Sequence, residues 1–144
     1  MRPGRGLALA GLLLALAGCI SVSETRGLAC AAGETRQQSA QLFFGRNIGH
    51  TLGVSEADFT RFLDEEVSPR FPDGLTVSDD QGRWLFKGEV FKEPGKRLDL
   101  ILTGKADDRR KLDEIATAYE TRFHQDAVLI VVHPACVVFH LAKP

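Results

Sequence analysis

The sequence of 144 residues lacks most of the patterns that mark an enzyme. It contains no Gly-x-Ser-x-Gly elbow, no His-Glu-x-x-His helix, no phosphate-binding loop and no dinucleotide fingerprint. It also lacks a basic stripe with interleaved aromatics, and its 18 Lys and Arg face 19 Asp and Glu, a balance that argues against nucleic acid as a partner. These absences predict no catalytic residue, no cofactor and no nucleic-acid binding.

The N-terminus has the organisation of a bacterial lipoprotein signal peptide. Two arginines precede a run from residue 6 to residue 17 that contains only Gly, Leu and Ala and is too short to span a bilayer. The run ends in Leu16-Ala17-Gly18-Cys19, which resembles a lipobox. We therefore predict a signal peptide over residues 1–18 and a lipid on Cys19 that anchors the protein to a membrane. The alternative is an ordinary secretory signal.

Two further consequences follow from this reading of the N-terminus. Ile20 is not the aspartate that, in lipoproteins of this kind, is associated with retention at the inner membrane. The resemblance therefore implies the cell envelope as the location, at the periplasmic face of the outer membrane. Residues 19–38 are polar and aperiodic, which predicts a lipidated cysteine with a flexible tether, and residues 39–144 are enough for a single domain.

Cysteine is scarce, and export changes what the three cysteines mean. If Cys19 carries lipid, Cys30 and Cys136 remain, and oxidising compartments allow such a pair to form a disulfide. The alternative is a buried free thiol at Cys136 and a loose one at Cys30. The cluster of His133, Cys136 and His140 fits no zinc spacing, so we predict no metal.

The order of elements predicts an α+β domain of the ferredoxin-like, split βαβ type. Apolar periodicity and turn signals predict strands near residues 40–46, 75–78, 98–103 and 128–133, with a tail strand through 136–141, and helices over 55–68 and 107–123. A hairpin around Lys87-Gly88 adds to the βαββαβ order between its two halves. We expect an antiparallel sheet with both helices on one face.

The second face of that sheet is expected to be partly apolar. Phe43, Ile101, Leu129 and Val131 fall on it by alternation, so something should cover it. Three covers are open: the hairpin with Trp84 together with the C-terminal tail, a homodimer partner, or a bound apolar ligand.

Two groups of residues on this domain are candidates for ligand binding. Asp99 and His133 fall on the second face, where a carboxylate and an imidazole with shifted pKa values could move a proton; the alternative is that both are solvated. In the segment from Arg70 to Thr76, Arg70 offers a rigid fork for an anion and Asp73 an acceptor. The structural alternative pairs Arg70 with Glu66 and lets Asp73 cap its own backbone.

Three strings carry a resemblance to a known family: Phe43-Phe44-Gly45-Arg46, residues 69–76 (PRFPDGLT) and Ala135-Cys136-Val137. Over residues 37–139 the chain resembles a family of bacterial envelope proteins known only as a domain of unknown function. The resemblance implies an exported location and a shared fold, and it implies no activity. Arg46, at the end of the first string, is a further candidate ligand-binding residue.

Together these features predict a lipid-anchored, non-enzymatic module that binds an unidentified protein or small molecule. The alternative is a small enzyme or ligand carrier built on a dimeric ferredoxin-like barrel with an apolar pocket.

Overall fold

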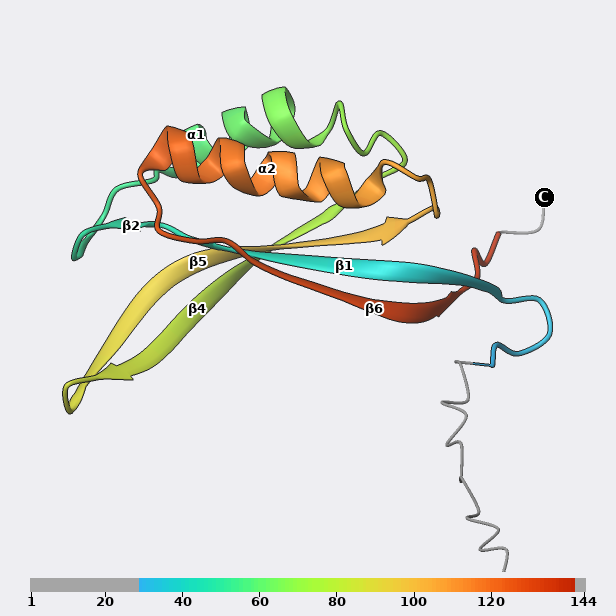
Figure 1. The fold of residues 1–144 in the computed structure, drawn as a ribbon, viewed down its shortest axis with the longest axis horizontal. Coiled ribbons are helices and arrows are strands. Elements are labelled where there is room, and N and C mark those ends of the chain that lie inside the picture. Colours follow the sequence, from blue (N-terminus) through green and yellow to red (C-terminus); the bar gives the residue numbers. More distant parts are fainter. Residues whose placement is uncertain (1–28, 142–144) are drawn as a thin grey trace, which may run out of the picture.

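A four-stranded antiparallel sheet with two helices on one face forms the domain (Figure 1). The computed structural model describes residues 29–141. Strands β1 (Thr35–Gly45), β4 (Thr76–Phe86), β5 (Glu89–Leu102) and β6 (Leu129–Val137) lie in the order β4-β5-β1-β6. A separate short hairpin joins β2 (Asn47–Ile48) to β3 (Thr51–Leu52). The predicted ferredoxin-like α+β fold is confirmed.

Both helices begin and end near the predicted positions. Helix α1 (Glu56–Phe62) continues as a π-helical segment, η1 (Leu63–Val67), and helix α2 spans Asp108–Phe123. The hydroxyl of Ser55 accepts a hydrogen bond from the backbone N–H of Asp58 at 3.1 Å, which caps α1 as the Ser-x-x-Asp spacing predicts. No helix within residues 29–141 is long and apolar enough to cross a membrane.

The central strand β1 is longer than its apolar core suggests. It begins at Thr35, so four residues of the expected tether, Thr35 to Gln38, belong to the sheet. They pair with β6 from Thr35↔Val137 to Gln38↔Pro134, and Gln38 also pairs with Leu102 of β5. These four consecutive polar residues predict a tether, but pairing with β6 makes them a strand, although the side chains of Thr35, Arg36 and Gln38 are exposed.

The hairpin around Lys87-Gly88 is continuous with two strands of the main sheet. Strands β4 and β5 pair without interruption from Thr76↔Asp99 to Phe86↔Glu89. Lys87 and Gly88 have φ angles of 49° and 82°, the left-handed values that a two-residue type I′ turn requires. The outer ends of β4 and β5 therefore form the hairpin that was expected between the two halves, and they extend well beyond the helices (Figure 1).

The core lies between the helices and one face of the sheet. Ala40, Leu42 and Phe44 of β1, and Leu98, Leu100 and Leu102 of β5, are at most 3% exposed. The ring of Phe44 meets Tyr119 of α2 edge-on at 4.7 Å between centroids. The buried Tyr119 hydroxyl donates to the carbonyl of Gly45 at 2.8 Å, so this polar group is satisfied in the core.

Candidate functional site

The face of the sheet opposite the helices, which we call the open face, carries both polar and apolar side chains. Cross-strand pairing places Thr76, Asp99, Gln41 and Val131 in one row of this face, and Ile101, Ser39 and His133 in the neighbouring row. Exposed apolar side chains on this open face include Ile101 (40%), Leu129 (60%) and Val131 (37%). The predicted partly apolar second face is therefore present, although β1 contributes mainly polar side chains to it.

A hollow of about 680 Å³ lies at one end of the open face. Its polar wall includes Gln37, Ser39, Thr76 and Asp99, and its apolar wall includes Ile101. Val138 and Phe139 of the C-terminal segment border it, so this tail lies beside the hollow rather than over the whole face. We call this hollow the open-face cavity.

Asp99 is a carboxylate on this face and lines the open-face cavity. Its Oδ1 accepts a hydrogen bond from the Gln41 amide at 2.7 Å, and its Oδ2 accepts one from Nε of Arg97 at 2.9 Å. The hydrogen bond from Gln41, with a further contribution from Arg97, lowers the pKa of Asp99 below its ordinary value. Asp99 is thus a carboxylate held ionised, suited to accept hydrogen bonds rather than to carry a proton at neutral pH.

The pair of Asp99 and His133, one of the two alternatives that the sequence leaves open, is not formed. Both lie on the open face, but Asp99 is opposite Gln41 and the exposed His133 is opposite Ser39, so the two belong to different rows on either side of β1. Each oxygen of the Asp99 carboxylate accepts one hydrogen bond, from Gln41 or from Arg97, and can still accept another. Asp99 and His133 therefore cannot exchange a proton directly, and Asp99 serves as a hydrogen-bond acceptor.

Arg70 and Asp73 do not share a site, although three positions separate them. Nη1 of Arg70 donates to the carbonyl and to Oε2 of Glu66 at 2.6 and 2.9 Å, and its Nε donates to Glu114 at 3.3 Å. Arg70 therefore links η1 to α2. This is the structural alternative, in which Arg70 pairs with Glu66. Asp73 instead borders the open-face cavity, with Lys105 at 3.8 Å.

Arg46 belongs to a third location, a charge cluster at the start of α1. Its side chain is 9% exposed, with Nε donating to the carbonyl of Val54 at 2.9 Å and Nη1 meeting Glu56 at 2.5 Å. Lys96, equally buried, meets Glu56 at 2.7 Å and Asp79 at 2.5 Å. Hydrogen bonds from Lys96 lower the pKa of both carboxyls, so the two cations are already neutralised by this chain.

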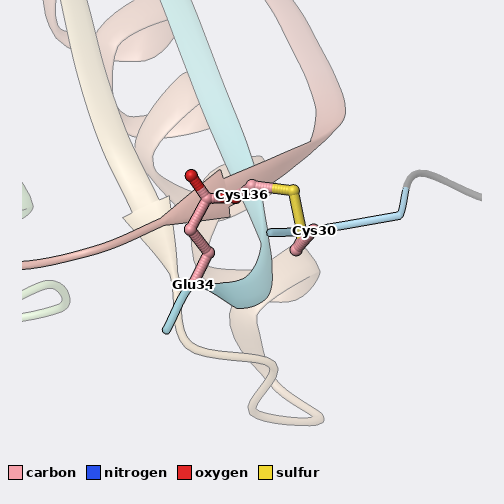
Figure 2. Close-up of side chains that lie close together, drawn as sticks. All are labelled: Cys30, Glu34 and Cys136. Carbon is pink, nitrogen blue, oxygen red and sulfur yellow. A yellow bond between two sulfur atoms is a disulfide. The ribbon is translucent and has the colours of Figure 1, made fainter. Parts of the chain in front are cut away.

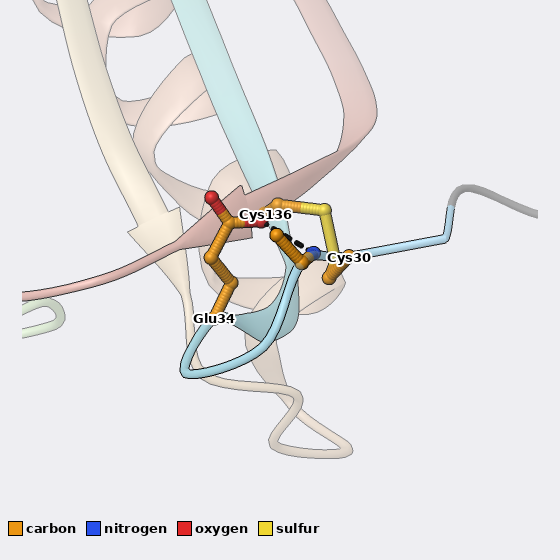
Figure 3. Close-up of a disulfide and its surroundings, with 4 residues drawn as sticks. Cys30, Glu34 and Cys136 are labelled. Carbon is orange, nitrogen blue, oxygen red and sulfur yellow. Dashed lines mark hydrogen bonds between the residues drawn. A yellow bond between two sulfur atoms is a disulfide. The ribbon is translucent and has the colours of Figure 1, made fainter.

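The disulfide predicted between Cys30 and Cys136 is present, with the Cα atoms 5.4 Å apart (Figure 2). It attaches the segment before β1 to β6. The Glu34 carboxylate accepts a hydrogen bond from the backbone N–H of Ala31 at 2.9 Å and so closes the turn between Cys30 and β1 (Figure 3). Ligand atoms of Cys30, Glu34 and Cys136 lie within 4.8 Å of one another, but the sulfurs are bonded to each other.

The sequence could have indicated more of the open-face cavity than was recognised. Gln37, Ser39 and Gln41 alternate with the buried Ala40 and Leu42, the period-two pattern of a half-buried strand. The charge cluster had no such signal, because Glu56, Asp79 and Lys96 meet only through the pairing of β4 with β5 and the position of α1. The expected lipid on Cys19 lies outside the described residues.

Two solved structures of phage SAM lyase resemble this domain in fold. A phage SAM lyase in its apo state superposes with a TM-score of 0.54 and 15% identity over 81% of this chain and 98% of that chain. A phage SAM lyase in complex with S-methyl-5'-thioadenosine gives 0.53 over the same shares and at the same identity. CutA from Synechococcus elongatus gives 0.48 at 12% identity over 72% of this chain and 80% of its own. At these identities the likeness concerns the fold alone.

Comparison of the sequence with curated proteins gives no match. A family model described as a protein of unknown function (DUF3574) matches residues 39–139, most of the described domain. The match includes the FFGR and PRFPDGLT strings and Cys136. The chain belongs to the DUF3574 family of proteins of unknown function.

Proposed function

We propose that this protein is a lipid-anchored module of the cell envelope that binds a small polar or amphipathic molecule in the open-face cavity, without catalysing a reaction on it. The observation that carries the proposal is the cavity itself: about 680 Å³ beside an uncovered sheet, lined by both apolar groups and hydrogen-bonding groups. Volumes in this range are typical of small-molecule sites.

The arrangement of the lining favours binding over chemistry. The ionised Asp99 and the hydroxyls of Ser39, Thr76 and Thr103 can accept hydrogen bonds from ammonium or hydroxyl groups of a ligand. Ile101 and Phe139 can pack against its apolar part. Because the pKa of Asp99 is lowered, this carboxylate is a weak base, which favours a recognition role over proton transfer.

The proposed lipid anchor is inferred from the sequence pattern that ends at Cys19. The disulfide at Cys30 then fixes how far the folded domain can lie from that lipid. Cys30 follows Cys19 by eleven positions, and Gly33 and Thr35 border the open-face cavity. An extended segment of this length spans roughly 35 to 40 Å, at about 3.3 to 3.6 Å per residue. A lipid on Cys19 would therefore keep the cavity close to a membrane surface.

A direct test is native mass spectrometry of the mature protein purified from membranes of the producing cell. We expect a bound small molecule on the wild-type protein and its loss from the Asp99→Asn variant, which keeps the shape of the side chain and removes the charge. The matched control is Asp113→Asn, an exposed carboxylate on α2. A wild-type protein without a bound molecule, or an Asp99→Asn variant that retains it, would contradict the binding role.

The same sample tests the anchor, because the intact mass reports any lipid on Cys19. A Cys19→Ser variant should be released from the membrane fraction.

A second candidate function, a ligand carrier or small enzyme formed by a homodimer across the open face, is favoured by the exposure of Leu129 and Ile101. A dimer by light scattering that is disrupted by Leu129→Glu would support it.

A further inference from the structure

The tip of the long β4–β5 hairpin, residues 83–92, has an unusual surface. Four large apolar side chains are exposed there: Trp84 (47%), Leu85 (70%), Phe86 (55%) and Val90 (53%). They gather on one projection that extends beyond the helices and the rest of the sheet (Figure 1). Exposed apolar clusters of this kind mark interaction sites.

The hairpin tip holds these side chains in a fixed arrangement. The strands are paired up to Phe86↔Glu89, and the two-residue turn at Lys87-Gly88 closes them tightly. The ring of Trp84 stacks on that of Phe91 at 5.7 Å with an interplanar angle of 13°, and Phe86 lies 6.4 Å from Phe91. The apolar surface is therefore presented by a stiff ribbon rather than by a loop that could fold back.

The hairpin tip is also basic, in a chain that is slightly acidic. Residues 83–92 contain Arg83, Lys87 and Lys92 against Glu89, a net charge of +2 (three minus one), whereas the whole chain has −1. Among the described residues, none of these three cations makes an ion pair with this chain, and the Lys87 ammonium lies 5.2 Å from the Phe86 ring centroid. Trp, Lys and Arg favour the boundary between lipid and water, and Phe and Leu commonly form the apolar side of protein surfaces that lie in it.

We infer that the hairpin tip inserts into the headgroup region of an anionic lipid surface. The exposed rings enter the boundary between headgroups and acyl chains, and the three cations meet lipid phosphates. A second copy of this chain is a poorer occupant, because a tip-to-tip contact would bring two patches of net charge +2 together. The inference rests on the proposed function only in that the anchor would hold the tip near a bilayer.

The position of the tip gives the domain a defined orientation at the membrane. The described chain begins at the end of the molecule opposite the hairpin tip, and both lie on the side of the sheet away from the helices (Figure 1). Contact through the tip, with the anchor at the other end, turns the open face and its cavity toward the lipid. A ligand that reaches the cavity from this side is amphipathic, which narrows the ligand class.

Trp84 makes this testable, because it is the only tryptophan in the chain and so reports on the hairpin tip alone. The mature protein purified from membranes is mixed with vesicles of phosphatidylcholine and phosphatidylglycerol, prepared with either ordinary or brominated acyl chains. We expect the Trp84 emission to shift to shorter wavelength with both, and to be quenched only by the brominated vesicles. Equal emission from brominated and ordinary vesicles would overturn the inference.

Variants separate insertion from simple proximity to the bilayer. Leu85→Ser with Phe86→Ser keeps Trp84 and removes two exposed apolar groups, and it should abolish the quenching. The matched control, Leu52→Ser, changes a side chain that is 57% exposed on the β2–β3 hairpin and should leave the quenching unchanged. Lys87→Glu with Lys92→Glu should weaken the quenching, and the effect of these charges should shrink at high salt. Quenching that survives the double serine variant would also overturn the inference.

The intact mass of the purified protein reports whether Cys19 carries a lipid, so it separates a failure of the lipid anchor from a failure of the hairpin-tip inference. If Cys19 carries no lipid but Trp84 is quenched, the anchor fails and the tip inference stands. If Cys19 is lipidated and Trp84 is not quenched, the tip inference fails and the anchor stands. Dimerisation without vesicles, with a blue-shifted Trp84 in the dimer, would assign the tip to a second copy instead and overturn the lipid assignment.

Discussion

The two faces of the sheet differ in what their side chains can contribute to stability. On the helix-covered face, Leu42, Phe44 and Leu98 are at most 1% exposed, whereas on the open face Leu129 is 60% and Ile101 is 40% exposed. Removal of apolar surface from water stabilises the fold by about 25 cal/mol per Å². The helix-covered face therefore holds the domain together, and the open face is free to bind.

The largest expected effect concerns the disulfide, because a sheet with one covered face has a limited core. The bridge joins residues separated by 106 positions, and the chain-entropy model gives a loop of this length about 4 to 5 kcal/mol. We expect the Cys30→Ser and Cys136→Ser double variant to lose up to this amount in urea denaturation under non-reducing conditions. An unchanged midpoint would show that the covered face is sufficient without the cross-link.

The second prediction compares the two faces directly by truncation to alanine. Phe44→Ala removes a ring that contacts Phe59, Phe62 and Tyr119 and should cost about 3 to 5 kcal/mol of unfolding free energy. Leu129→Ala on the open face should cost about 0.5 kcal/mol or less. A large, concentration-dependent cost for Leu129→Ala would mean that a second copy covers the open face in solution.

A smaller loss of unfolding free energy is expected when the buried Tyr119 hydroxyl is removed from the helix-covered face. Tyr119→Phe removes the hydrogen bond to the Gly45 carbonyl and should cost about 1 kcal/mol, since a buried acceptor loses its partner. Burial raises the pKa of Tyr119, so the hydroxyl is neutral at neutral pH and can donate this hydrogen bond. A neutral outcome in chemical denaturation would indicate that another donor replaces the tyrosine.

The smallest expected effect is a change in how stability depends on pH when Asp99, on the open face, is replaced. The folded-state pKa of Asp99 is lowered by Gln41 and Arg97, so its contribution to stability is present above the ordinary pKa of about 4 and is lost as pH falls through the folded value. We expect the melting temperature to decline less below about pH 4 in Asp99→Asn than in the wild-type protein. Identical pH profiles would mean that these hydrogen bonds do not persist in solution.

The sequence alone determined the fold class and the covalent plan of the domain. Periodicity located α1 with η1, α2 and the Lys87-Gly88 turn, because amphipathic spacing, an N-cap serine and left-handed turn residues act over a few neighbouring positions. The pairing of Cys30 with Cys136 followed from the number of cysteines and the predicted export. The lipid on Cys19 stays a prediction.

Only the tertiary structure decided which candidate residues come together. It assigned Arg70 to Glu66 and Glu114, Arg46 to the cluster with Glu56, and Asp99 to Gln41 and Arg97. Strand register sets the contact of Asp99 with Gln41, because a shift of one residue would turn the side chain to the other face of the sheet. The contacts of Arg70 and Arg46 depend instead on where α2 and α1 lie. Register depends on pairings between residues far apart in the chain, such as Gln41 with Asp99, and these are not encoded in any local pattern.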